Sequence, residues 1–312
     1  MEKVIFLKPH ISHTIWGGSL LRDEFGIDEP GDDIGECWGV SAHPSGESRA
    51  CGGEFDGMNL SEIWTERRDV FGNVSGDRFP LLVKLIDAKA DLSIQVHPDD
   101  EYARQHENGS LGKSECWYIL NCPEDGEIVL GHNAKTSDEL CKMIDDGMWN
   151  DLIRVVRVHP GDVISIEPGT VHAIKAGICL LETQQSSDIT YRLYDYDRLQ
   201  NGKPRMLHLA QSKDVIKVPS EPEDSLIKSF PETDESGIVF LTGTDHYKVY
   251  RVNVIGDYSF SLDEPFLNAT VIKGSGCIFG KSIKKGDNMI ITHEGVKNIE
   301  LTGDMELIVS GI

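Results

Sequence analysis

A short segment carries two side chains that could hold a metal ion. Gln95 and His97 lie two residues apart. If residues 92–97 form a strand, both side chains point to one face, because successive side chains alternate across a sheet. Glu115 opens a second strand-like run, and His172 follows a Pro-Gly turn. Two imidazoles, a carboxylate and an amide oxygen make a mixed ligand set that suits zinc or another divalent transition metal and leaves room for water or substrate.

The elements that must position these residues are mostly strands. Short β-branched runs are broken by Gly, Pro, Asn or Asp, a pattern typical of strands joined by turns. The expected strands are residues 80–86, 92–97, 116–120, 128–131, 162–166 and 178–183.

Three short helices are expected between the strands of the N-terminal part. Asn59 followed by Glu62 is typical of a helix start, and apolar residues recur behind it at helical spacing. Ser137 can cap a second helix, with Leu140 and Ile144 on its inner face. Pro98 is expected in the first turn of a third helix, directly after His97.

A weak internal repeat indicates two similar units. Residues 160–166 resemble residues 285–291, and residues 271–278 suggest a hairpin with a glycine-rich turn. Two tandem jelly rolls, each a sandwich of short antiparallel strands, would explain the repeat. The second copy lacks the ligand pattern, so we expect His293 to be a surface turn residue.

The division between the units should fall in a segment rich in proline and acidic residues. We expect a catalytic domain with helical insertions over residues 1–218, a linker over 219–234, and a degenerate jelly roll over 235–312.

Composition excludes several classes of function. Thirty basic and 52 acidic residues give a formal charge of −22, which argues against binding to nucleic acid or to an anionic membrane. The seven cysteines contain no Cys-x-x-Cys pair, so neither a disulfide framework nor a thiolate zinc site is indicated. No apolar run is long enough for a signal peptide or a membrane span. These features predict a cytoplasmic protein.

Several motifs resemble those of the type I phosphomannose isomerases, in the same order and with similar spacing between residues 8 and 209. They are residues 16–18, 35–38, 79–84, 92–99, 113–115, 169–173 and 191–192. The length resembles the short bacterial branch of that family. The resemblance implies a mainly β chain of two tandem cupin-type jelly rolls. It also implies an aldose–ketose isomerase with one Zn2+ per chain, which interconverts mannose 6-phosphate and fructose 6-phosphate through a cis-enediol.

The resemblance also implies roles for individual residues. Gln95, His97, Glu115 and His172 match the zinc ligands of the family, and Arg192 matches its active-site arginine. The arginine could bind the phosphate or stabilise the enediolate.

Other candidate site residues lie in or beside these motifs in the sequence. Lys113 precedes Glu115 by two residues, which would place both in one cavity, although a solvated loop lysine is an equally good interpretation. Glu182 alternates with apolar neighbours and could carry a proton or anchor a hydroxyl. We therefore predict catalytic roles for Arg192, Lys113 and Glu182. Substrate contacts are predicted for Ser93, Lys84 and Trp16, although Trp16 could instead be a packing anchor.

Two other functions fit parts of the pattern. The chain could be a non-catalytic cupin that binds a sugar or a metal, or another cupin metalloenzyme such as an iron-dependent dioxygenase. The retained Lys113 and Arg192 argue against the first, and the glutamine ligand argues against the second. The expected partner is a small sugar phosphate, and both a monomer and a dimer remain open.

Overall fold

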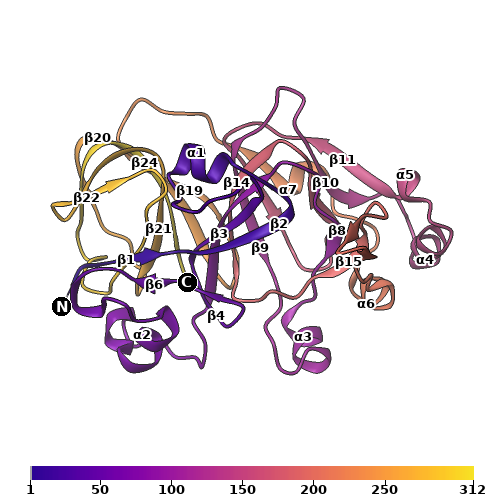
Figure 1. The fold of residues 1–312 in the computed structure, drawn as a ribbon, viewed down its shortest axis with the longest axis horizontal. Helices are drawn as coiled ribbons and strands as arrows, with labels where there is room; N and C mark the ends of the chain where they lie inside the picture. The colour runs from indigo at the N-terminus through magenta and orange to yellow at the C-terminus, as the bar shows by residue number, and fades with distance from the viewer. Residues whose placement is uncertain (1) are drawn as a thin grey trace.

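Three large β-sheets form the framework of the computed structural model, which describes residues 2–312 (Figure 1). Their strands run antiparallel, and the helices are short. The prediction of a mainly β chain is confirmed. Within the described residues, no helix combines the length and apolar character needed to cross a membrane.

Two sheets form the N-terminal half and carry the predicted ligands. The seven-stranded sheet has the order β18 (Ile227–Ser229), β12 (Asp162–Ile166), β9 (Glu115–Asn121), β14 (Ile178–Gln185), β7 (Leu81–Ala88), β3 (Ile34–Val40) and β2 (His10–Gly18). The five-stranded sheet has the order β11 (Ile153–Arg157), β10 (Glu127–His132), β13 (His172–Ile174), β8 (Ile94–Val96) and β15 (Tyr191–Tyr194). Every residue of β7 and β14 is buried, as expected for central strands covered on both faces.

The expected strands are present, but one is shorter than predicted. Residues 92–97 contain only the three-residue strand β8, and His97 lies directly after it. Pro98 explains the early end, since proline has no N–H to donate to a sheet.

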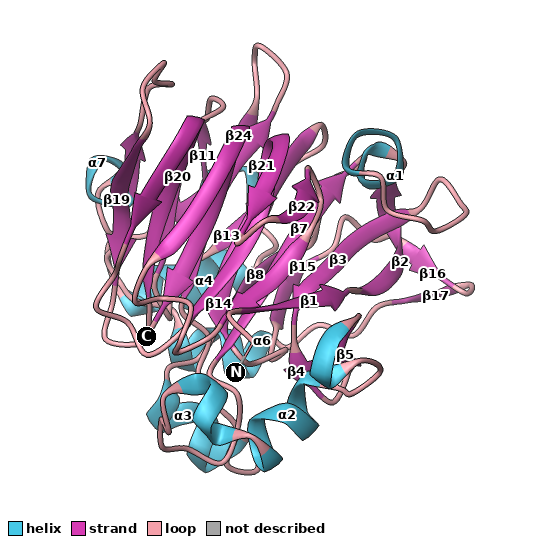
Figure 2. Ribbon diagram, turned by 90° about the vertical axis from the view of Figure 1, so that its left-hand side faces the viewer, coloured by secondary structure: helices cyan, strands magenta, loops and turns pink. Residues whose placement is uncertain are grey.

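An eight-stranded sheet forms the C-terminal half, and its long strands β20, β21 and β24 lie side by side in Figure 2. Its order is β19 (Gly237–Gly243), β20 (Lys248–Phe260), β24 (Ile299–Gly311), β21 (Leu267–Ile278), β23 (Asn288–Ile291), β1 (Val4–Lys8) and β6 (Arg49–Ala50), with β22 (Lys281–Lys284) beside β21. The N-terminal strand β1 thus pairs with β23, and β18 from the expected linker pairs with β12. The expected boundary near residue 218 therefore does not separate the sheets.

The internal repeat corresponds to a shared turn. Gly161 and Gly286 both have positive φ, 89° and 94°, and each precedes a strand. In each copy the aspartate after the glycine accepts a backbone N–H at 2.8 Å, from His159 to Asp162 and from Lys284 to Asp287.

The hairpin predicted within residues 271–278 is wrong. These residues belong to one strand, β21, which pairs with β24. A Cβ atom on Gly276 would lie 2.1 Å from the carbonyl oxygen of Thr302. This glycine therefore permits a close approach of two strands rather than a turn.

The three predicted helices are present, with two shifted starts. The backbone N–H of Asn59 donates to Glu62 at the start of α2 (Leu60–Glu66), as predicted. Thr136, not Ser137, caps α4 (Ser137–Asp145), because its hydroxyl accepts the N–H of Glu139. Asp99 caps α3 (Asp100–His106), so Pro98 lies before that helix rather than in its first turn. The other short elements are α1 (Leu20–Phe25), α5 (Trp149–Leu152), α6 (Leu209–Val215), α7 (Glu223–Leu226), the 3-10 helices Gly53–Phe55 and Arg68–Phe71, β4 (Ala42–His43), β5 (Gly46–Glu47), β16 (Leu199–Gln200) and β17 (Lys203–Pro204).

A hydrophobic core joins the two halves. Phe266 from the C-terminal half packs against Trp64, Phe71 and Phe79, with ring centroids 6.2, 5.2 and 5.5 Å away. Such aromatic packing buries a large apolar area at the junction.

Candidate active site

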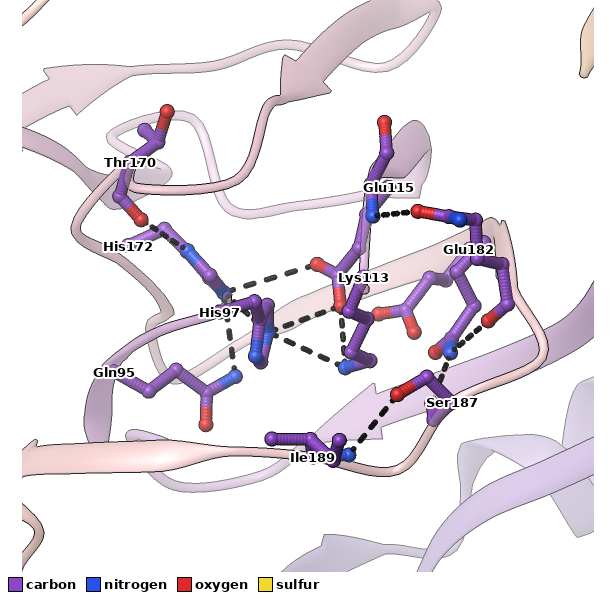
Figure 3. Close-up of polar contacts among 12 residues, drawn as sticks. Gln95, His97, Lys113, Glu115, Thr170, His172, Glu182, Ser187 and Ile189 are labelled. Carbon is purple, nitrogen blue, oxygen red and sulfur yellow. Dashed lines mark hydrogen bonds and ion pairs between the residues drawn. The ribbon is translucent and has the colours of Figure 1, made fainter. Parts of the chain in front are cut away.

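The predicted metal ligands come from the two facing sheets of the N-terminal half. Gln95 on β8 and His172 on β13 are register partners, and His97 follows β8. Glu115 begins β9 in the opposite sheet. Figure 3 shows the four side chains pointing toward one another.

The candidate ligand atoms converge at distances of 3.1–3.7 Å. His97 Nε2 lies 3.1 Å from His172 Nε2 and 3.1 Å from Glu115 Oε1. Glu115 Oε2 lies 3.7 Å from His172 Nε2, and the side-chain nitrogen of Gln95 lies 3.4 Å from the same atom. Histidines 97 and 172 and Glu115 are fully buried, and one ligand atom from each lies within 4.8 Å of the others. This group could hold a metal ion.

The chemistry of these donors fits a divalent metal. His172 donates its Nδ1–H to the carbonyl of Thr170 at 2.9 Å, which leaves the Nε2 lone pair facing the cluster. Burial and the nearby Lys113 lower the pKa of His97 to about 3, so its imidazole is neutral, as a ligand must be. Glu115 Oε2 is buried without a hydrogen-bond partner, whereas Oε1 lies beside Lys113. A 180° rotation of the Gln95 carboxamide would turn its oxygen toward the cluster.

A cavity of about 410 Å³ opens beside this cluster. Gln95 and Lys113 line it, which connects the cavity to the ligand group. All the other residues for which we predicted catalytic roles or substrate contacts also line it: Trp16, Lys84, Ser93, Glu182 and Arg192.

Two buried lysines face the cavity. Lys113 Nζ lies 2.5 Å from Glu115 Oε1 and 3.3 Å from His97 Nε2, and the residue is 4% exposed. The solvated-loop interpretation of Lys113 is therefore excluded. Lys84 Nζ lies 3.3 Å from Glu182 Oε1 and 5.0 Å from the centre of the Trp38 ring. Burial opposes the charge of Lys84, but neighbouring glutamates, Glu182 first, outweigh burial and raise its pKa, so the ammonium stays charged.

Glu182 is one of the carboxyl groups that line the cavity. It lies on β14, buried, and the Trp117 Nε1–H donates to its Oε2 at 3.1 Å. Burial, reinforced by the negative charge of Glu115, raises the pKa of Glu182 above its usual range. A carboxyl group with a raised pKa can take up and release a proton closer to neutral pH.

Arg192 lies half-buried on β15, where it is the register partner of Gln95 on β8. Its Nε–H donates to Ser93 Oγ at 3.2 Å, and Nη1 donates to the carbonyl of Met206 at 3.0 Å. These contacts fix the plane of the guanidinium and join two of the predicted residues.

Sequence reasoning missed a second arginine in this cavity. Arg205 lines it and donates to both carboxylate oxygens of the buried Asp195, at 2.7 and 2.6 Å. The Asn201-Gly202 pair between them signals the hairpin that joins β16 to β17, but no sequence pattern marks the contact of Arg205 with Asp195.

Comparison with known proteins places the chain in a family. The catalytic-domain model of phosphomannose isomerase type I matches residues 4–121, and the cupin-domain model of mannose-6-phosphate isomerase matches residues 237–312. Mannose-6-phosphate isomerase ManA of Bacillus subtilis (strain 168) is 48% identical over 98% of each chain. The chain belongs to the type I phosphomannose isomerase family.

Other members of the phosphomannose isomerase family agree with this assignment. Mannose-6-phosphate isomerase of Streptococcus mutans serotype c is 40% identical over 99% of this chain and 98% of its own. A crystal structure of the mannose 6-phosphate isomerase from Bacillus subtilis superposes with a TM-score of 0.93 at 44% identity, covering 100% of both chains. The cupin-type fold implied by the sequence resemblance is confirmed.

Proposed function

We propose that this chain is a zinc-dependent mannose-6-phosphate isomerase that works through a cis-enediol. One observation carries the proposal: the cavity that opens beside His97, Glu115 and His172 also holds Glu182 and Arg192. The names of the similar proteins support the same substrate.

The cavity suits a small anionic sugar. Its volume of about 410 Å³ lies in the usual range for small-molecule sites. Four cationic side chains line it, Lys84, Lys113, Arg192 and Arg205, against three carboxylates, Glu36, Glu182 and Asp188, although the chain carries a net charge of −22. The local excess of positive charge is what a sugar phosphate requires.

The residues divide the chemistry between proton transfer and charge stabilisation. Isomerisation moves a proton from C2 to C1 of the sugar, and a second proton moves between the two oxygens. Glu182 would take the C2 proton and return it at C1, while Lys84 holds the carboxylate in place. Zn2+, when bound by the His97 cluster, would polarise the sugar oxygens as a Lewis acid. Arg192 would bind the phosphate or the developing enediolate charge.

A coupled assay that follows fructose 6-phosphate tests the proposal. Activity should disappear on chelation and return with Zn2+, and elemental analysis of the purified protein should find zinc. Fully metal-loaded protein that binds the sugar phosphate without turnover would instead favour a non-catalytic cupin. Iron as the bound metal would favour another metalloenzyme.

A further inference from the structure

A turn of the C-terminal sheet reaches the back of the active-site segment that carries Lys113 and Glu115. The hydroxyl of Tyr247, at the turn between β19 and β20, lies 3.3 Å from Ser114 Oγ. Both residues are buried, at 2% and 1% exposure. The preceding residue, His246, places its Nε2 3.7 Å from Asp100 Oδ2. Two consecutive residues of the C-terminal half thus contact Ser114 and Asp100, which lie next to Lys113.

The backbone around Ser114 is held by its own half of the molecule. Ser114 N–H donates to Gln185 Oε1 at 3.0 Å, and its carbonyl accepts the Gln185 N–H at 3.2 Å. Lys113 N–H donates to the carbonyl of Pro98 at 3.0 Å. Asp100 Oδ1 accepts the Gly112 N–H at 2.7 Å and the Gln185 side chain at 3.0 Å. Asp100 therefore links His246 to this network.

The side chain of Ser114 points away from the cavity. Lys113 and Glu115 contact each other through their side chains, and Lys113 lines the cavity, whereas Ser114 faces Tyr247. Alternation along an extended segment requires this arrangement. A rotation of the segment about its own axis would displace Lys113 and Glu115 together, and the Tyr247 contact opposes that rotation.

We infer that Tyr247 is a positioning residue, which uses the C-terminal half to hold Lys113 and Glu115 at their places in the active site. The inference rests on the proposed isomerase function. It gives the C-terminal sheet a part in the reaction, although among the described residues its strands supply no member of the candidate metal cluster.

The substitution Tyr247→Phe removes the hydroxyl and keeps the buried ring. We expect kcat to fall about 10-fold with KM changed less than about twofold, because a displacement of about 1 Å can cost up to about 100-fold in rate. Tyr118→Phe is the matched control. Its hydroxyl donates to Glu306 Oε1 at 3.1 Å across the same junction, away from Ser114. This control should lose stability but keep kcat.

Amide hydrogen exchange gives a second measurement that needs no activity. Exchange at Lys113 and Ser114 should accelerate in Tyr247→Phe and stay unchanged in Tyr118→Phe. Inactive wild-type protein would contradict the proposed function, and the exchange result would still decide the positioning role.

Three outcomes would overturn the inference. They are an unchanged kcat in Tyr247→Phe, an equal loss of kcat in Tyr247→Phe and Tyr118→Phe, or unchanged hydrogen exchange at the amides of Lys113 and Ser114 in Tyr247→Phe. If Tyr247→Phe does not fold, Ser114→Ala removes the same hydrogen bond from the other side. A 10-fold loss of kcat in Ser114→Ala would then support the inference, and wild-type kcat would refute it. Where all variants fold, kcat of the double variant Tyr247→Phe, Ser114→Ala should fall no further than kcat of either single variant, because both substitutions remove the same hydrogen bond.

Discussion

Four buried charged side chains form one wall of the candidate active site, and each is held by a partner. Lys113 pairs with Glu115, and Lys84 pairs with Glu182. Removing one partner of such a pair leaves an uncompensated buried charge, which costs more than the pair itself contributes. Substitutions in this wall should therefore conserve charge or shape if their effect on catalysis is to be separated from their effect on folding.

Arg192→Lys satisfies that condition. We expect the variant to keep its fold and its metal and to lose about 2–4 kcal/mol of transition-state stabilisation, as found for single preorganised electrostatic contacts. A compact ammonium cannot reach both Ser93 and the Met206 carbonyl, as the planar guanidinium does. Steady-state kinetics provides the measurement.

The kinetic pattern for Arg192→Lys would also separate two roles. Equal falls in kcat and kcat/KM would indicate action on the developing charge, whereas a raised KM alone would indicate a phosphate contact. Arg104→Lys, an exposed position on α3, is the control and should behave as wild type. Wild-type kinetics for Arg192→Lys would contradict its predicted role.

The pH dependence should reveal Glu182. Burial and Glu115 raise the pKa of this carboxyl group, and a base must be ionised to accept a proton. The rate constant kcat/KM should therefore rise with pH through a value above about 4.3, the ordinary pKa of glutamate. In Glu182→Gln we expect a loss of about 100- to 10,000-fold, with no such rise in the residual activity. If kcat/KM of Glu182→Gln still rises with pH in the same way, the titrating base is another group.

The ligand cluster could be predicted at this scale, and the Asp195–Arg205 pair could not. Gln95 and His97 owe their common direction to a two-residue spacing, which is a local property. His172 joins them from the neighbouring strand and Glu115 from the other sheet. Their residue types suggested one ligand set, and the family resemblance supported it. Arg205 reaches the cavity through a hairpin and a buried ion pair with Asp195, and no periodicity marks that contact.

At the scale of elements, local rules predicted the strands well and their ends less well. Strand β8 ends early because Pro98 cannot pair in the sheet. The glycines of residues 271–278 suggested a turn, but the close contact of β21 with β24 requires them within a strand. A glycine alone does not distinguish a positive φ from a close backbone approach.

The start of α4 offers a paired test of helix capping. Thr136→Ala should lower the free energy of unfolding by about 1 kcal/mol, because the hydroxyl that accepts the Glu139 N–H is lost. Ser137→Ala, one residue later, should change it by less than about 0.5 kcal/mol. Urea denaturation of both variants would measure this. A larger loss in Ser137→Ala would show that Ser137 caps the helix after all.

At the scale of the whole molecule, a candidate metal cluster occurs once among residues 2–312. Among the described residues the only cluster of this kind is His97, Glu115 and His172, and His293 of the second copy lies exposed in a turn. We expect one tightly bound metal per chain after dialysis. His172→Ala should lose most of that metal, and His293→Ala should keep it. Two equivalents in the wild type, or stoichiometric metal in His172→Ala, would contradict the assignment.

The two halves share strands and core, so we expect them to unfold together. Strand β1 belongs to the C-terminal sheet, and Phe266 packs among aromatic residues of the N-terminal half. All five tryptophans lie in the first 149 residues, so their fluorescence reports mainly on the N-terminal half, with Trp64 at the junction. Leu307 is buried on β24 in the core of the C-terminal half.

Leu307→Ala should therefore shift the unfolding transition seen by tryptophan fluorescence, although the tryptophans lie far from residue 307 in the sequence. The variant should lose about 2–5 kcal/mol, the usual cost of a cavity in a packed core. If unfolding is a single transition, the denaturation midpoint from tryptophan fluorescence should fall as far as the midpoint from circular dichroism. Leu180→Ala, in the N-terminal core, should lower both midpoints in the same way. A fluorescence midpoint unmoved by Leu307→Ala would show that the halves unfold independently, despite the strand and the aromatic core that they share.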